Sequence, residues 1–74
     1  MRLENIEALV DGAGEITIGR IGPIPCAATA SDDDQQYAML VRRPRESLEA
    51  LLKRLDHALE RAWEHDEFTD EING

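Results

Sequence analysis

The segment Ser47–His65, SLEALLKRLDHALERAWEH, decides the fold of this chain. Its apolar side chains recur at intervals of three and four residues, a spacing that places them on one face of a helix. They are Leu48, Leu51, Leu52, Leu55, Ala58, Leu59 and Ala62. Ser47 is a suitable N-cap residue, and Glu49 lies near the positive end of the helix dipole. The sequence therefore predicts one long amphipathic helix that packs its leucine face against the rest of the protein.

The opposite face of this helix carries charged residues four positions apart. Glu49 and Lys53 have opposite charges and support the helix, whereas Asp56 and Glu60 have the same charge and oppose it slightly. All four side chains are expected to face solvent. The helix does not depend on either pair.

A shorter helix is predicted near the N-terminus. Apolar residues between Leu3 and Val10 again follow a helical spacing, and Gly12 and Gly14 provide a stop signal. This pattern predicts a first helix over residues 2–11.

The middle of the chain predicts three strands. Residues 15–21, EITIGRI, alternate between apolar and polar side chains, as a half-buried strand does. Residues 24–30 contain Pro25, which favours an edge strand or an irregular start, and their small side chains let a helix approach closely. A solvated turn is expected at 31–36, SDDDQQ, and a further strand at 37–42, YAMLVR.

In chain order these elements are helix, strand, strand, strand, helix. They predict an α+β fold in which a three-stranded antiparallel sheet is covered on one face by the long C-terminal helix. Residues 1–65 are expected to form a single small domain. Residues 66–74, which contain few apolar side chains, are predicted to be an acidic, disordered tail.

Composition limits the classes of function. The 74 residues hold 16 Asp and Glu against 8 Lys and Arg, a formal net charge of −8 that opposes direct binding to nucleic acid. Cys26 is the one cysteine, so no internal disulfide is expected, and its surroundings favour an ordinary buried or half-buried thiol. With no signal peptide and no apolar run of about 20 residues in the sequence, we expect a cytoplasmic protein without a membrane partner.

The sequence shows no constellation of catalytic or metal-binding residues. Asp32–Asp34 lack the glycine and glutamate positions of an EF-hand loop and suit a polar hairpin tip better. His57 and His65 are eight residues apart, too far for joint ligation of one metal. Neither Ser31 nor Ser47 lies in the glycine-flanked elbow of a nucleophile. We therefore expect a non-enzymatic protein without a cofactor or metal.

Two kinds of surface are candidates for binding a partner. Trp63, on the flank of the leucine face, is either a lid on the core or an exposed anchor. The acidic candidates are Asp66, Glu67, Asp70 and Glu71, and the basic candidates are Arg42, Arg43 and Arg45, near Lys53 and Arg54. The arginines either grip an anion or neutralise the acidic residues of the chain. The leucine face is also wide enough to support a homodimer.

In element order the chain resembles the double-stranded-RNA-binding domain, but residues 46–51 contain two acids and no lysine where that family has a phosphate-binding lysine cluster. The helix that begins Ser47-Leu48-Glu49-Ala50-Leu51-Leu52 and continues to Ala58-Leu59-Glu60 is similar to the helix that follows the sheet in HicB-type antitoxins. The loop before it departs from that family, because Arg43-Pro44-Arg45 replaces the expected proline- and glycine-containing sequence.

Three hypotheses follow. The leading one is a small, acidic protein-binding module that contacts a more basic partner through the long helix and Trp63, or through the acidic tail. The alternative is an antitoxin-like or nucleic-acid-mimicking regulator that occupies the basic site of another protein. A third, metal-dependent hypothesis rests on His57, Glu60 and Glu64 of the long helix and requires a second subunit.

Overall fold

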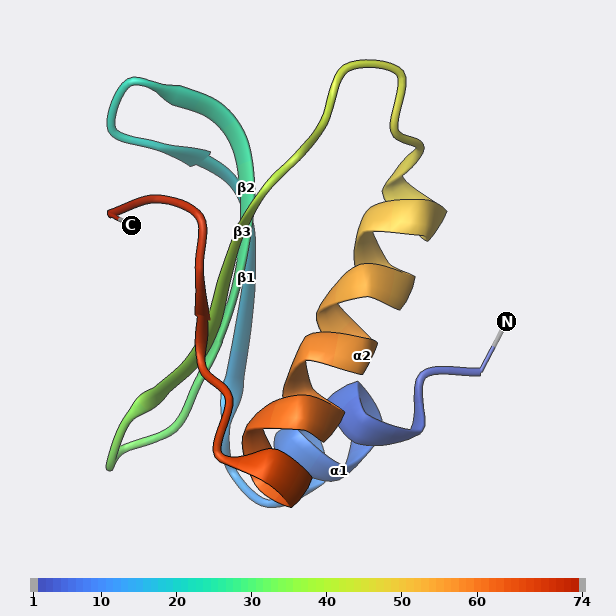
Figure 1. The fold of residues 1–74 in the computed structure, drawn as a ribbon, viewed down its shortest axis with the longest axis vertical. Coiled ribbons are helices and arrows are strands. Elements are labelled where there is room, and N and C mark those ends of the chain that lie inside the picture. The colour runs from blue at the N-terminus through green and yellow to red at the C-terminus, as the bar shows by residue number, and fades with distance from the viewer. Residues whose placement is uncertain (1, 74) are drawn as a thin grey trace.

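Two helices lie on one side of a four-stranded sheet (Figure 1). The computed structural model describes residues 2–73. Its elements are α1 (Glu4–Asp11), β1 (Glu15–Ile21), β2 (Ile24–Ser31), β3 (Gln36–Val41), α2 (Leu48–His65) and β4 (Thr69–Asp70). The predicted α+β fold, with helix, three strands and helix in that order, is confirmed.

The sheet has four strands, so the prediction of three is wrong. Its order is β1-β2-β3-β4, in which the first three strands are antiparallel and β4 runs parallel to β3. The fourth strand lies in the acidic segment 66–74. Only two residues form it, opposite Ala38 and Met39 of β3, and two residues are too few to show an alternating pattern.

The register of the sheet places its small side chains under α2. Ala28 of β2 pairs with Leu40 of β3, and Ala30 pairs with Ala38. These side chains are buried and form one core cluster with the helix residues Leu51, Leu55, Ala58, Leu59 and Ala62. Because alanine projects only a methyl group, the helix approaches the sheet closely along β2. The half-buried Cys26 also packs against this cluster.

The long helix begins as the sequence predicts. The Ser47 hydroxyl oxygen accepts a hydrogen bond from the backbone N–H of Ala50 at 3.0 Å, which is the geometry of an N-cap. The helix ends at His65. Asp66 then adopts the left-handed conformation, with φ 54°, and its N–H donates to the carbonyl of Arg61.

Asp56 does not face solvent, contrary to the expectation from its helical position. Its side chain is buried between α1 and α2. One carboxylate oxygen, Oδ1, accepts hydrogen bonds from the backbone N–H groups of Asn5 and Ile6, both at 2.9 Å. Leu3, the N-cap residue of α1, has no side-chain hydrogen bond to offer. Asp56 therefore caps the first helix from the second, in place of a local side chain.

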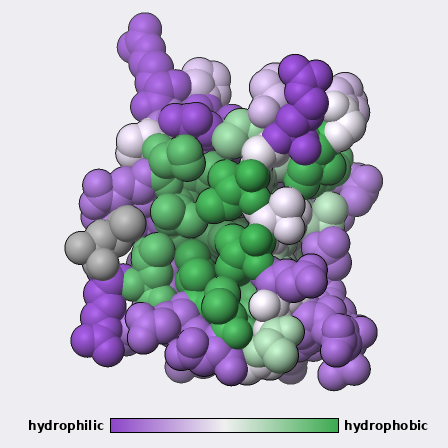
Figure 2. All heavy atoms as spheres, turned by 180° about the vertical axis from the view of Figure 1, so that it is seen from behind, coloured by the Kyte–Doolittle hydropathy of each residue, from purple (hydrophilic) through white to green (hydrophobic). Residues whose placement is uncertain are grey.

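The view from behind shows apolar side chains gathered in the middle of that face, surrounded by hydrophilic ones (Figure 2). The exposed apolar residues of the molecule include Ile18 of β1, the strand at one edge of the sheet, and Leu48 at the start of α2. The homodimer expected from the width of the leucine face stays a prediction. Within residues 2–73, no helix is both long and apolar enough to cross a membrane.

Candidate functional site

The three aromatic residues of the chain meet at the C-terminal end of α2. Tyr37 of β3 lies between Trp63 of α2 and Phe68, which follows the helix; we call these three residues the aromatic cluster. The ring centroids of Tyr37 and Trp63 are 5.7 Å apart, and the rings meet edge to face at 71°. The rings of Tyr37 and Phe68 stack, with centroids 6.4 Å apart. Both geometries are favourable for aromatic pairs.

The cluster has a buried base and an exposed rim. Tyr37 is 8% exposed, whereas Trp63 is 39% exposed and Phe68 is 50% exposed. Trp63 therefore combines both alternatives: part of the ring covers the core, and part of it is exposed. One side rests on Tyr37, and the rest is open to a partner. Phe68 reaches this position because the chain reverses at Asp66.

Tyr37 is held in place by the turn that precedes β3. Its hydroxyl donates a hydrogen bond to Asp32 Oδ2. Asp32 Oδ1 accepts from the backbone N–H groups of Asp34 and Gln35, at 2.8 and 3.0 Å. The hydrogen bond from Tyr37, followed by the backbone hydrogen bonds, lowers the pKa of Asp32, so this carboxylate carries a negative charge beside the cluster.

Four further acidic residues lie close in sequence to Trp63 and Phe68. Glu60, Glu64, Asp66 and Glu67 are all exposed. Within residues 2–73 their carboxylates have no hydrogen-bond or ion-pair partner. They therefore outnumber the nearby Arg61 and leave an excess of negative charge near Trp63 and Phe68 in the sequence.

The other acidic candidates take part in the structure. Asp70 Oδ1 accepts hydrogen bonds from the backbone N–H groups of Ile72 and Asn73, at 2.9 and 2.8 Å. Both bonds lower the pKa of Asp70, and the bond from Asn73 has the larger effect. Glu71 Oε1 accepts from the Val41 N–H, and Glu71 Oε2 accepts from Arg54, both at 2.9 Å. Asp66 and Glu67 are thus the tail carboxylates that remain available to a partner.

Arg54 forms the most extensive charge network of the described residues. Its Nε donates to Glu46 Oε2 at 2.7 Å, and its Nη2 donates to Glu46 Oε1 at 3.0 Å and to the Val41 carbonyl at 2.9 Å. These contacts join the loop before α2 to the end of β3. The Arg54 guanidinium lowers the pKa of Glu46 to about 2, and Glu46 in turn raises the pKa of Arg54.

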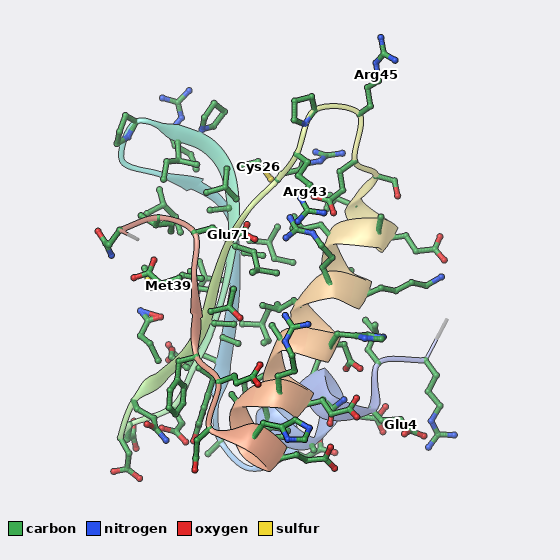
Figure 3. All side chains as sticks on the ribbon, viewed as in Figure 1. Glu4, Cys26, Met39, Arg43, Arg45 and Glu71 are labelled. Atoms are coloured by element: carbon green, nitrogen blue, oxygen red, sulfur yellow. The ribbon has the colours of Figure 1, made fainter. Side chains whose placement is uncertain are left out.

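The three candidate arginines do not form one patch. Arg42 Nε donates to the Glu46 carbonyl at 2.8 Å. Arg43 lies between the sheet and α2, whereas Arg45 points away from the top of the loop (Figure 3). Arg45 has φ 66°, so the backbone changes direction between the two side chains. The arginines also lie at the opposite end of α2 from the aromatic cluster.

A groove of about 430 Å³ lies between α2 and the edge formed by β3 and β4. Its lining residues are Leu40, Arg43, Ala50, Lys53, Arg54, His57, Arg61, Thr69 and Glu71. The sequence reasoning included Arg43, Lys53 and Arg54 in a basic set but missed Arg61. A signal was present, because Lys53, His57 and Arg61 recur every four residues on one side of the helix.

The metal-dependent hypothesis gains no support from the geometry. His57 lies on the groove, while Glu60 and Glu64 are exposed and unpaired. No group of three or more His, Cys, Asp or Glu side chains placed to hold a metal ion occurs among residues 2–73.

Comparison with protein-family models, curated proteins and solved structures gives no match. The likenesses to RNA-binding domains and to HicB-type antitoxins are therefore not supported by a family match. The function has to be argued from the aromatic cluster, the charges and the groove.

Proposed function

We propose that this chain is a non-enzymatic binding module that recognises a basic segment of another protein through the aromatic cluster and the acidic side chains around it. The observation that carries the proposal is the exposure of Trp63 and Phe68 above the buried Tyr37. Aromatic side chains that are held rigidly and only partly covered lose little entropy on binding, and Trp and Tyr are enriched at binding hot spots.

The charges favour a basic partner. Glu60, Glu64, Asp66 and Glu67 offer unpaired carboxylates close in sequence to the two exposed rings. Lys and Arg side chains are attracted both by carboxylates and by the faces of aromatic rings. A partner segment rich in Lys or Arg therefore matches the surface in both respects, and its association should be faster at low salt.

A nucleic-acid mimic that occupies the basic site of another protein is the second candidate, favoured by the net charge of −8. The two candidates differ in the source of the binding free energy. A mimic binds through carboxylates, so loss of Trp63 and Phe68 has little effect. A module that uses the aromatic cluster loses most of its affinity with the rings, because hot-spot residues contribute about 2 kcal/mol or more each.

The experiment compares three proteins in parallel pull-downs from a nuclease-treated lysate of the source organism. They are the wild type, Trp63→Ala/Phe68→Ala, and the control Val10→Ala, which removes an exposed apolar side chain from α1. We expect a basic partner that the wild type and the control retain and the double variant loses. Circular dichroism should show that all three proteins are folded.

Two results would contradict the proposal. One is a partner that the double variant retains as well as the wild type does. The other is a partner that the Val10 control loses to the same extent. In the first case, the combined variant Glu60→Gln/Glu64→Gln/Asp66→Asn/Glu67→Gln decides whether the carboxylates alone bind, as the mimic requires.

A further inference from the structure

The groove between α2 and the β3–β4 edge concentrates positive charge in an acidic protein. Four of its lining residues, Arg43, Lys53, Arg54 and Arg61, are half of the eight Lys and Arg residues of the chain. His57 lies among them, and Glu71 is the one carboxylate among the lining residues. No residue of the aromatic cluster lines the groove. The groove is therefore a second feature, separate from the proposed protein-binding surface.

Glu71 and Arg54 form a fixed wall of the groove. Both Glu71 carboxylate oxygens are occupied, one by Val41 N–H and the other by Arg54. Arg54 is further bound by Glu46 through two hydrogen bonds. One guanidinium is thus shared by the carboxylates of Glu46 and Glu71, so this wall keeps one net negative charge. The three other cations that line the groove outweigh it.

The remaining cations are available. The side chains of Arg43 and Arg61 have no hydrogen-bond or ion-pair partner within residues 2–73. Lys53 pairs with Glu49 at 3.4 Å, but both side chains are more than half exposed, so this ion pair is weak. The Arg43 backbone is fixed, because its N–H donates to Glu46 Oε1 at 3.0 Å. Two free guanidinium groups and an ammonium group therefore face one groove.

The free cations of the groove favour a phosphate group as ligand. A guanidinium presents paired N–H donors that match two oxygens of a phosphate, and a dianion gains more from several cations than a single carboxylate does. Leu40 and Ala50 leave an apolar part of the wall for a small organic group. The volume lies within the usual range of small-molecule sites.

The same charges exclude a long polyanion. The protein measures only 29 × 27 × 21 Å and has a net charge of −8, so a nucleic acid that extended beyond the groove would meet repulsive carboxylates. A compact ligand stays within the local positive potential. We propose that this groove binds a small phosphate-bearing molecule through the side chains of Arg43, Lys53 and Arg61.

The test is a titration of the ¹⁵N-labelled protein with inorganic pyrophosphate, followed by NMR in about 50 mM NaCl, where surface charges are only partly screened. We expect saturable shifts at the amides of groove residues. Arg43→Gln/Arg61→Gln should weaken binding about a hundredfold, because each lost charge-assisted hydrogen bond costs about one factor of ten or more. Arg45→Gln removes a cation from the same loop but outside the groove, and it should change the affinity less than about twofold.

Three results would overturn the proposal. They are the absence of saturable shifts at groove amides, equal affinity of the wild type and the double variant, and equal weakening by Arg45→Gln, which would indicate a response to net charge alone. A single-stranded RNA oligonucleotide titrated in parallel tests ligand size, and tighter binding of the RNA would contradict a small ligand. The aromatic cluster is unchanged in all these variants, so failure here leaves the proposed function standing.

Discussion

Asp56 in α2 accepts two hydrogen bonds from Asn5 in α1, one from the backbone N–H at 2.9 Å and one from the side-chain amide at 3.0 Å, across 51 positions of sequence. The contact joins the only two helices of residues 2–73. It also satisfies N–H groups at the start of α1 that Leu3 has no side-chain oxygen to satisfy. The N-terminus of the short helix is therefore capped by a residue of the long helix.

Replacement of Asp56 by alanine should destabilise the protein by about 1–3 kcal/mol, because the variant loses a helix cap and leaves partly buried donors without an acceptor. Glu60→Ala is the matched control, since Glu60 is an exposed acid on the same helix. Urea unfolding followed by circular dichroism gives both values. Equal stability of the two variants would show that the Asp56 contact contributes nothing.

The sequence was sufficient for the elements that repeat a pattern over several residues. The long helix with its Ser47 cap and the first three strands all follow from apolar periodicity and turn residues. Asp56 and β4 were missed for different reasons. The role of Asp56 depends on a partner in a distant helix, and β4 is a two-residue strand whose position is set by the chain reversal at Asp66.

Glu46 should make stability depend on acid pH. Its pKa is about 2 in the folded protein, below the ordinary value of 4.5, because of the hydrogen bonds from Arg54 first and from the Arg43 N–H second. A carboxyl group whose pKa is lower in the folded state stabilises the fold above its unfolded-state pKa. That stabilisation is lost as the pH falls from 4.5 toward about 2.

The measurement is the free energy of unfolding of the wild type and Glu46→Gln as a function of pH. The difference between them should be constant above about pH 5 and should close as the pH falls toward 2. Asp32 and Asp70, whose pKa values are also lowered, are present in both proteins and cancel in the difference. A difference that does not change with pH would show that Glu46 is not held in its charged form.

The candidate site was predictable only in part. The sequence placed Trp63 on the flank of the leucine face, and in the structure the side chain is packed against Tyr37 and partly exposed. The other two residues of the aromatic cluster, Tyr37 of β3 and Phe68 after α2, come from separate parts of the chain, and no spacing in the sequence connects them. The basic residues were grouped by their proximity in the sequence. Side chains close together in a loop can point apart, as those of Arg43 and Arg45 do. Residues one helical turn apart lie on the same side of the helix, as His57 and Arg61 do.

Gly14 should not tolerate a side chain. A Cβ atom at this position would lie 2.6 Å from Leu9 Cγ and 2.9 Å from the Leu9 carbonyl oxygen, and Leu9 belongs to the core. Gly14→Ala should therefore destabilise the protein by about 1–3 kcal/mol through overpacking. Gly12→Ala is the control, because the nearest atom to its Cβ would be the Ala8 oxygen at 3.3 Å. Thermal unfolding should rank Gly14→Ala clearly below Gly12→Ala, and the reverse order would refute the packing argument.

Glu71 should determine how firmly β4 is held against β3. Its side chain accepts from Val41 N–H, its backbone N–H donates to the Met39 carbonyl at 2.8 Å, and its other carboxylate oxygen binds Arg54. Glu71→Ala removes both side-chain contacts and leaves β4 held by its backbone pairing with β3. Hydrogen exchange at the Val41 amide should accelerate about tenfold or more, which corresponds to about 1.4 kcal/mol.

Glu67→Ala is the matched control for this measurement, since it removes an acid with no side-chain partner within residues 2–73. Its exchange at Val41 should equal that of the wild type. If both variants exchange alike, the Glu71 side chain does not hold the strand. If Glu71→Ala alone accelerates exchange, the Glu71 side chain holds the end of β3 through the Val41 amide, beside the Arg54 contact that forms one wall of the groove.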